Sequence, residues 1–221
     1  MNYRKIGVAF TICMVLSLVS AGSAQANWEI EGKSFSSGQM EDVSIQSSEG
    51  YDLDTTVVGL HLTITATGVH CTGTCTIDES GNVELVDGKL EFTGMTVDTP
   101  AGCTIPSTMT TRTLSAELIM DPGGGTATFL RWKPATGETI AEFELGGTCA
   151  LAGTPLRIKG TITSRLNNTG VSAVEQPATF SFAEQTTGGG SLKAGKEVAT
   201  LTGKLGIKLS GANAAKKWSG S

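Results

Sequence analysis

Residues 60–66 read LHLTITA, and their pattern indicates the fold class of the whole chain. Leucine, isoleucine and alanine take every second position, and histidine and threonine take the positions between them. Because successive side chains of a strand point to opposite faces, this alternation predicts a β-strand with one buried face. The same period recurs in residues 114–120, which read LSAELIM, and in residues 156–163, which read LRIKGTIT.

Working outward from this stretch, the pattern predicts twelve strands separated by turn-forming residues. They lie at 41–46, 57–66, 74–78, 82–86, 89–97, 108–120, 126–132, 138–145, 147–151, 156–165, 178–184 and 196–209, the last with a break near Gly203. Threonine, valine and isoleucine dominate these segments, and their branched side chains suit a pleated surface. Short strands with frequent turns predict an all-β fold, either an antiparallel β-sandwich or a flattened β-barrel.

One turn carries a more specific prediction. Asp87 and Gly88 separate residues 82–86 from residues 89–97, and both residue types tolerate a positive φ. Two-residue turns of this composition join strands that pair with each other. We therefore expect residues 82–86 and 89–97 to form a β-hairpin.

The beginning of the chain, residues 1–26, has the composition of a cleavable signal peptide. Arg4 and Lys5 precede an apolar run at 6–19, and Ala24-Gln25-Ala26 then supplies the small residues of a cleavage site. The run is shorter than the roughly 18–20 residues of a membrane-spanning helix, which argues against the alternative of a membrane anchor. We expect a secreted, periplasmic or extracellular protein with no stable membrane span after cleavage.

Beyond residue 26 we expect a main β domain at 27–166 and a C-terminal β segment at 167–221. A polar stretch at 167–177 marks the boundary, and the C-terminal segment is too short for a good core of its own. It should therefore pack on the same sandwich. The formal net charge of the whole chain is −5, and loss of Arg4 and Lys5 would make it more negative. Binding to nucleic acid through phosphate neutralisation is not expected.

Four cysteines follow the signal: Cys71, Cys75, Cys103 and Cys149. An even number in an exported chain predicts two disulfides, for which three pairings exist. We favour Cys71–Cys75 and Cys103–Cys149. The first pairing requires a bend at Gly73, because residues four apart in a straight strand lie too far apart for a disulfide. No second Cys/His pair stands at zinc spacing, so we expect neither a metal site nor a cofactor.

The chain has few residues suited to catalysis. It contains two histidines, His61 and His70, and no serine-hydrolase elbow, zinc-protease motif or phosphate-binding glycine loop. We therefore expect no catalytic residues and no enzymatic activity. The hydrolase alternative would require a cleft in which His61 or His70 meets a serine or a glutamate.

Tryptophan offers a second alternative, a binding module for a carbohydrate or an apolar ligand. Flat aromatic rings stack on sugar faces, and the chain has Trp28, Trp132 and Trp218. Trp132 is the candidate ligand-binding residue, because it shares a strand face with Leu130. The competing interpretation is that all three rings pack in the core.

Residues 71–149 contain stretches that are similar to those of a known group of proteins. These stretches are FTGMTV at 92–97, CTIP at 103–106 and TRTLSAEL at 111–118. The chain resembles a group of uncharacterised exported β-rich proteins of soil bacteria. Members of that group often carry a cysteine where this chain has Met95, which is one more reason to pair Cys71 with Cys75 here. The resemblance implies export but no activity.

Together these observations predict an exported, non-enzymatic protein with a structural or binding role. Its site of action would be the cell envelope or the space outside the cell. The expected partner is an envelope or extracellular polymer, and the sequence does not indicate an oligomeric state.

Overall fold

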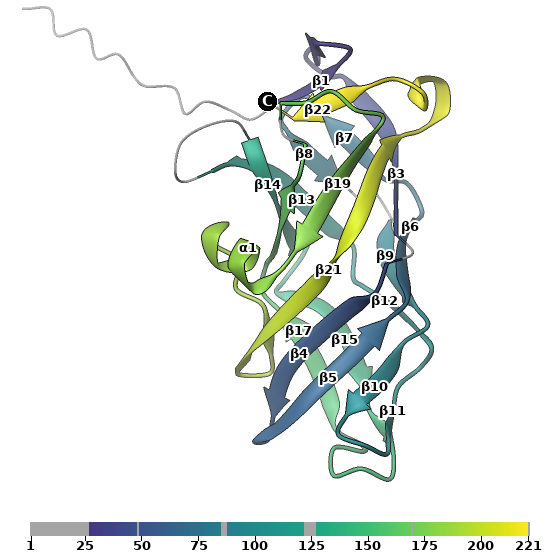
Figure 1. Ribbon diagram of the computed structural model, residues 1–221, viewed down its shortest axis with the longest axis vertical. Coiled ribbons are helices and arrows are strands. Elements are labelled where there is room, and N and C mark those ends of the chain that lie inside the picture. Colours follow the sequence, from purple (N-terminus) through teal and green to yellow (C-terminus); the bar gives the residue numbers. More distant parts are fainter. Residues whose placement is uncertain (1–26, 48, 85–87, 122–126, 169, 221) are drawn as a thin grey trace, which may run out of the picture.

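The computed structural model describes residues 27–47, 49–84, 88–121, 127–168 and 170–220 (Figure 1). The predicted signal peptide at 1–26 lies outside these residues. The described chain consists almost wholly of antiparallel strands, and eight of them close into a barrel. The predicted all-β fold is therefore confirmed.

The closed barrel is a ring of eight antiparallel strands in which each strand pairs with the next. In ring order they are β3 (Met40–Ser47), β7 (Thr76–Asp78), β8 (Asn82–Glu84), β13 (Leu114–Met120), β14 (Ala127–Pro134), β18 (Ile162–Leu166), β19 (Glu175–Phe180) and β21 (Glu197–Leu209). The ring closes where β21 pairs with β3, with Ile207 opposite Ile45. Both side chains are buried, and closure removes the unpaired edges of an open sheet.

A second group of strands, here called the lower section, continues from the closed barrel toward the bottom of Figure 1. It comprises β4 (Tyr51–Val57), β5 (Leu60–Ala66), β10 (Thr96–Thr99), β12 (Thr108–Thr110), β15 (Thr139–Glu144), β17 (Pro155–Lys159) and β20 (Lys193–Ala194). β15, β17, β20, the first half of β21, β4, β5 and β10 pair in that order. β6 (Gly68–Thr72) and β9 (Lys89–Thr93) connect β3 of the closed barrel to β12.

Strand β21 belongs to both parts of the molecule. Residues 199–202 pair with β4, whereas residues 203–208 pair with β19. The predicted break near Gly203 is wrong, because the strand continues and only its partner changes. Gly203 has φ +147°, and a Cβ at this position would clash with the ring of Tyr51. Glycine lets the strand pass Tyr51 without losing its hydrogen bonds.

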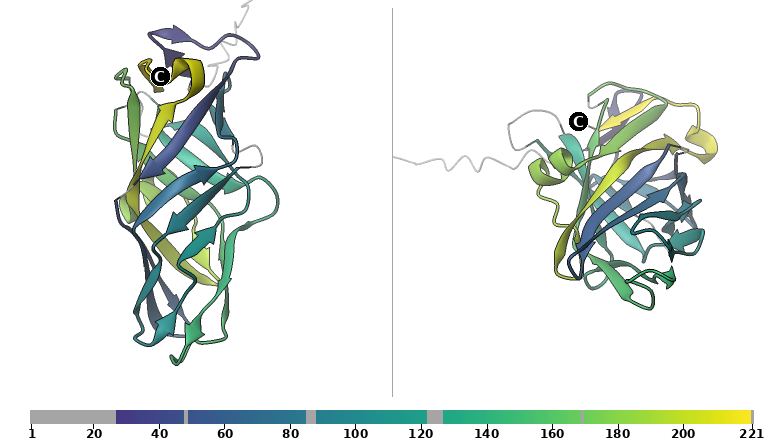
Figure 2. Two further views of the ribbon diagram at one scale, coloured as in Figure 1. Left: turned by 90° about the vertical axis from the view of Figure 1, so that its right-hand side faces the viewer. Right: turned by 60° about the horizontal axis from the view of Figure 1, so that its bottom comes forward.

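Short elements complete the two ends of the molecule. β1 (Trp28–Ile30), β2 (Lys33–Ser34) and β22 (Trp218–Gly220) form a small sheet at one end of the closed barrel (Figure 2). In this sheet the rings of Trp28 and Trp218 pack with centroids 5.2 Å apart. β11 (Cys103–Thr104) pairs with β16 (Gly146–Gly147) at the opposite end.

The segment 167–221 supplies β19 and β21 to the closed barrel, β20 to the lower section and β22 to the small sheet with β1 and β2. It also contains α1 (Phe182–Thr187) and η1 (Gly211–Asn213). Among the described residues, no helix has the length and apolar composition needed to cross a membrane.

Helix α1 corrects the strand expected at 178–184. The strand β19 ends at Phe180, and Ser181 caps the helix by accepting a hydrogen bond from the Glu184 N–H at 3.2 Å. A serine followed three residues later by a glutamate is an ordinary helix-start signal, and it outweighed the apolar alternation here.

The strand expected at 57–66 is in fact the second half of a hairpin. β4 and β5 pair along their whole length, and Val58 and Gly59 form the turn with φ values of 49° and 79°. Two consecutive positive φ values define the turn type that matches strand twist, usually made by Asn-Gly. The sequence did not predict this turn, because its first position is valine and branched residues rarely adopt a positive φ.

The hairpin predicted around Asp87 and Gly88 is wrong. β8 pairs with β7 and β13, whereas β9 pairs with β6 and β12. Asp87 itself lies outside the described residues. β8 belongs to the closed barrel, whereas β9 lies between β6 and β12, so the tertiary pairing of the two strands overrides the local turn preference.

Candidate functional site

An apolar cavity of about 60 Å³ lies at the junction of the closed barrel and the lower section. Leu114, Trp132 and Phe180 line it from the barrel strands β13, β14 and β19. Leu53 and Ile158 line it from β4 and β17 of the lower section. The alternation of each strand directs its apolar side chains inward, so the cavity wall is the buried face of both parts.

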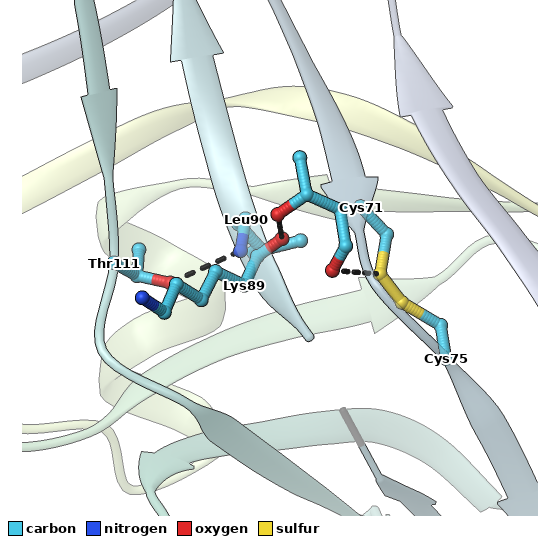
Figure 3. Close-up of a disulfide and its surroundings, with 6 residues drawn as sticks. Cys71, Cys75, Lys89, Leu90 and Thr111 are labelled. Atoms are coloured by element: carbon cyan, nitrogen blue, oxygen red, sulfur yellow. Dashed lines mark hydrogen bonds between the residues drawn. A yellow bond between two sulfur atoms is a disulfide. The ribbon is translucent and has the colours of Figure 1, made fainter. Parts of the chain in front are cut away.

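The polar atoms in the cavity wall already have hydrogen-bond partners. The Thr111 Oγ1 accepts a hydrogen bond from the Leu90 N–H at 3.0 Å (Figure 3). The Thr65 Oγ1 lies 2.7 Å from the Thr96 Oγ1. A ligand in this cavity therefore meets hydrocarbon and aromatic surface, and little polar capacity remains for recognising a polar molecule.

Tyr51 is the one phenol in the cavity wall. Its hydroxyl donates a hydrogen bond to the backbone carbonyl of Lys204. Burial raises the pKa of Tyr51 above its ordinary value, since the charged phenolate is poorly solvated in the interior. The Tyr51 hydroxyl is therefore neutral, and its hydrogen is already donated to a backbone carbonyl.

Trp132, the residue proposed from the sequence as a ligand contact, lines this cavity and is only 1% exposed. Its indole N–H donates a hydrogen bond to the Ser164 Oγ at 3.0 Å. Trp28 and Trp218 are also buried, and they pack on each other at the far end of the barrel. The three rings therefore do not form a common surface for stacking on a sugar.

The two histidines lie apart on exposed strand faces, each beside a carboxylate. The His61 Nε2 is 3.7 Å from the Asp54 Oδ1, and the His70 Nε2 is 3.6 Å from the Glu91 Oε1. Within the described ranges, neither histidine has a hydrogen bond with a serine hydroxyl. His70 thus meets a glutamate and lines a surface cleft that Ser47 also lines, but within the described residues no hydrogen bond joins His70 to Ser47.

The candidate metal ligands of the chain are its His, Cys, Asp and Glu side chains. In the part of the chain that the structure describes, no three of these side chains converge closely enough to hold a metal ion.

The structure joins Cys71 to Cys75 and Cys103 to Cys149, which is the pairing favoured from the sequence. The Cα atoms of the first pair are 6.8 Å apart, and Gly73 between them makes the required bend with φ 80°. Figure 3 shows this disulfide beside the strand that carries Leu90. The second pair has Cα atoms 4.9 Å apart and ties β11 to the chain that follows β16.

The cavity itself was not found by sequence reasoning. The alternation predicts which residues face inward. A cavity, however, forms only where the side chains that meet in the interior are too small to fill it, and these side chains come from strands that are far apart in the chain. Trp132 was the one lining residue singled out beforehand.

Comparison with known proteins assigns no family to this chain. No protein-family model, curated protein or solved structure matches it. The resemblance to exported proteins of soil bacteria therefore stays a prediction.

Proposed function

We propose that the protein is an exported, non-enzymatic binding protein that takes a small apolar molecule into the cavity between the closed barrel and the lower section. The observation that carries this proposal is the cavity wall, in which Trp132, Phe180 and other apolar side chains surround an empty volume. Eight-stranded barrels have interiors that are either filled by side chains or hold one small ligand.

The size of the cavity limits its occupant. One water molecule needs about 10–15 Å³ on the same measure, whereas this cavity has about 60 Å³. Water would gain few hydrogen bonds there, because the polar wall atoms are already paired. A short hydrocarbon suits the cavity better than water. Larger ligands, an aromatic ring included, would require the walls to move, because an apolar cavity that holds benzene has a volume of about 150 Å³.

The route to the cavity passes the wall residues that reach the surface. Thr65 and Met109 are partly exposed, whereas the other residues of the wall are buried. Met95, also in the wall, precedes β10, which pairs with β5 beside Thr65. Methionine side chains have three rotatable bonds and adapt to irregular gaps. Rotation of Met109 would admit a small apolar molecule without breaking a strand pair.

Export is supported by two features of the chain. Residues 1–26 have the pattern of a signal peptide, and the two disulfides are typical of proteins that fold in an oxidising compartment. A binding role at the envelope or outside the cell agrees with both. Intact mass measurement of the secreted protein tests export, with a mature chain beginning at Asn27 as the expected result.

The binding proposal is tested with propane as a probe, a hydrocarbon small enough for the cavity. We expect propane to raise the melting temperature and to change the tryptophan emission, because Trp132 lines the cavity. In Ala141→Val the added methyl groups enter the cavity, so the response to propane should be lost while stability is kept. Absence of any propane response in the unmodified protein would contradict the proposal.

A matched variant separates cavity filling from general damage. Ala178 is buried in the closed barrel but does not line the cavity. Ala178→Val should therefore lower the free energy of unfolding by about 1–3 kcal/mol through overpacking, yet keep the propane response below its melting temperature. Equal loss of the response in both variants would show that the cavity is not the binding site.

A further inference from the structure

A second concave site lies on the outer surface and has the opposite chemistry. This cleft of about 670 Å³ is lined by four lysines, Lys133, Lys159, Lys193 and Lys196. They come from β14, β17, β20 and the turn between β20 and β21. The concentration of positive charge contrasts with the net charge of −5 for the whole chain.

Two of these lysines face each other directly. Lys159 of β17 and Lys193 of β20 are opposite each other in the antiparallel register. The preceding pair, Ile158 and Ala194, is buried, so alternation points both lysines away from the core. Like charges at directly opposed positions destabilise a sheet, and an anion bound between them would relieve the repulsion.

Neighbouring carboxylates do not neutralise this pair. Among the described residues, no ion pair joins Lys159, Lys193 or Lys196 to a carboxylate. Lys133 does approach the Glu117 Oε2 at 3.6 Å, and Glu138 is an acidic residue of the cleft wall. Three ammonium groups that have no ion-pair partner among the described residues therefore share the cleft with one carboxylate, that of Glu138.

Three glycines, Gly137, Gly160 and Gly195, line the cleft and do not narrow it with side chains. Thr161 and Ser191 add hydroxyl groups, whose Oγ1 and Oγ atoms lie 3.4 Å apart. Ammonium groups and hydroxyls that line one cleft are suited to bind the oxygen atoms of an anion.

From this geometry we infer that the cleft binds a small polyanion that carries at least two phosphate, sulfate or carboxylate groups. Several lysines favour more than one negative group on the ligand. A small ligand is favoured because the acidic surface elsewhere on the chain repels a long polyanion such as nucleic acid. The cleft is on the outer face of β17 and β20, so this inference does not depend on the apolar cavity.

The inference is tested by calorimetric titration of the mature protein with inorganic pyrophosphate at about 20 mM salt, where screening is weak. We expect binding that weakens as the salt concentration rises. In the double variant Lys159→Gln, Lys193→Gln the affinity should fall at least about tenfold, because two charged hydrogen-bond donors are lost. Sulfate and citrate, titrated in parallel, identify the preferred anionic group.

The chain also provides a matched control. Lys204 and Lys208 form ion pairs with Glu49 and Glu175 at 3.4 and 2.7 Å and lie outside the cleft. The double variant Lys204→Gln, Lys208→Gln removes the same net charge and should bind pyrophosphate as tightly as the unmodified protein. Equal weakening in the two double variants would overturn the inference in favour of general charge attraction. Failure of pyrophosphate, sulfate and citrate alike to bind would also overturn it.

Discussion

The closed barrel and the lower section are built from the same alternating strands, yet their interiors are filled differently. At the capped end of the closed barrel, Trp28 and Trp218 are fully buried and pack ring against ring. At the junction with the lower section, two of the residues in the wall are alanines, Ala66 and Ala141, and an apolar cavity remains. Alternation decides which side chains point inward, but it does not ensure that the inward side chains of facing strands fill the space between them. The cavity lies near Gly203, where β21 exchanges one partner for another.

The largest expected effect concerns the capped end. Trp218→Ala removes the contact with Trp28 and the hydrogen bond from the indole N–H to the Val174 carbonyl. We expect the free energy of unfolding to fall by about 3–5 kcal/mol, as is usual for a buried tryptophan, when measured by urea denaturation. Phe182→Ala is the control, because that ring is 61% exposed, and it should change stability little. Similar losses in the two variants would mean that the cap is not a packed core.

The two disulfides allow a comparison of loop lengths. Cys103 and Cys149 are separated by 46 residues, and Cys71 and Cys75 by four. On the chain-entropy model, removing the long link should cost about 4 kcal/mol and removing the short one about 2 kcal/mol. Thermal unfolding of the two double-alanine variants provides the measurement. A larger loss for the short link would show that local geometry, not loop closure, governs their contributions.

Gly203 tests whether the junction itself depends on glycine. Gly203→Ala adds a methyl group against the ring of Tyr51 at φ +147°, so we expect a loss of about 2–3 kcal/mol. Gly38→Ala is the control, because Gly38 also has a positive φ but nothing lies within 4 Å of an added Cβ. That variant should lose only about 1 kcal/mol from backbone strain. If both variants lose the same amount, the Tyr51 contact does not constrain the strand.

The smallest expected effect is at the turn between β4 and β5. Val58 has φ 49° and is 85% exposed, so its branched side chain contributes strain but little packing. Val58→Asn should raise the free energy of unfolding by about 0.5–1 kcal/mol, because asparagine tolerates this conformation. Thr56→Asn, two residues away in regular β4, should not stabilise. A destabilised Val58→Asn variant would indicate that Val58 makes a contact needed for folding.

Sequence reasoning was strongest where one local property decides the outcome. The alternation of residues 60–66 and 114–120 correctly predicted strands, and the bend at Gly73 followed from the short separation of Cys71 and Cys75. It was weakest where two local signals competed. Ser181 and Glu184 begin a helix within a segment of apolar alternation. The turn at Val58 has valine where asparagine is usual, so its sequence does not indicate a turn.

The candidate sites show the same limit. Trp132 could be singled out as an aromatic residue on a strand face, but whether that face was inside or outside depended on the strands around it. Lys159 and Lys193 are 34 positions apart, and only the pairing of β17 with β20 brings them together. Nothing in the sequence near either lysine identifies the other.

By itself, the amino-acid sequence determined the all-β class, the inward-facing positions of most strands and the supply of cysteines for two disulfides. These properties depend on periodicity and composition, which act over a few residues. Only the tertiary structure decided which strands pair, where the barrel closes and where β21 changes partners. Strand pairing joins segments far apart in the chain, and its free energy depends on the fit of whole surfaces. The apolar cavity and the lysine cleft are both products of that fit.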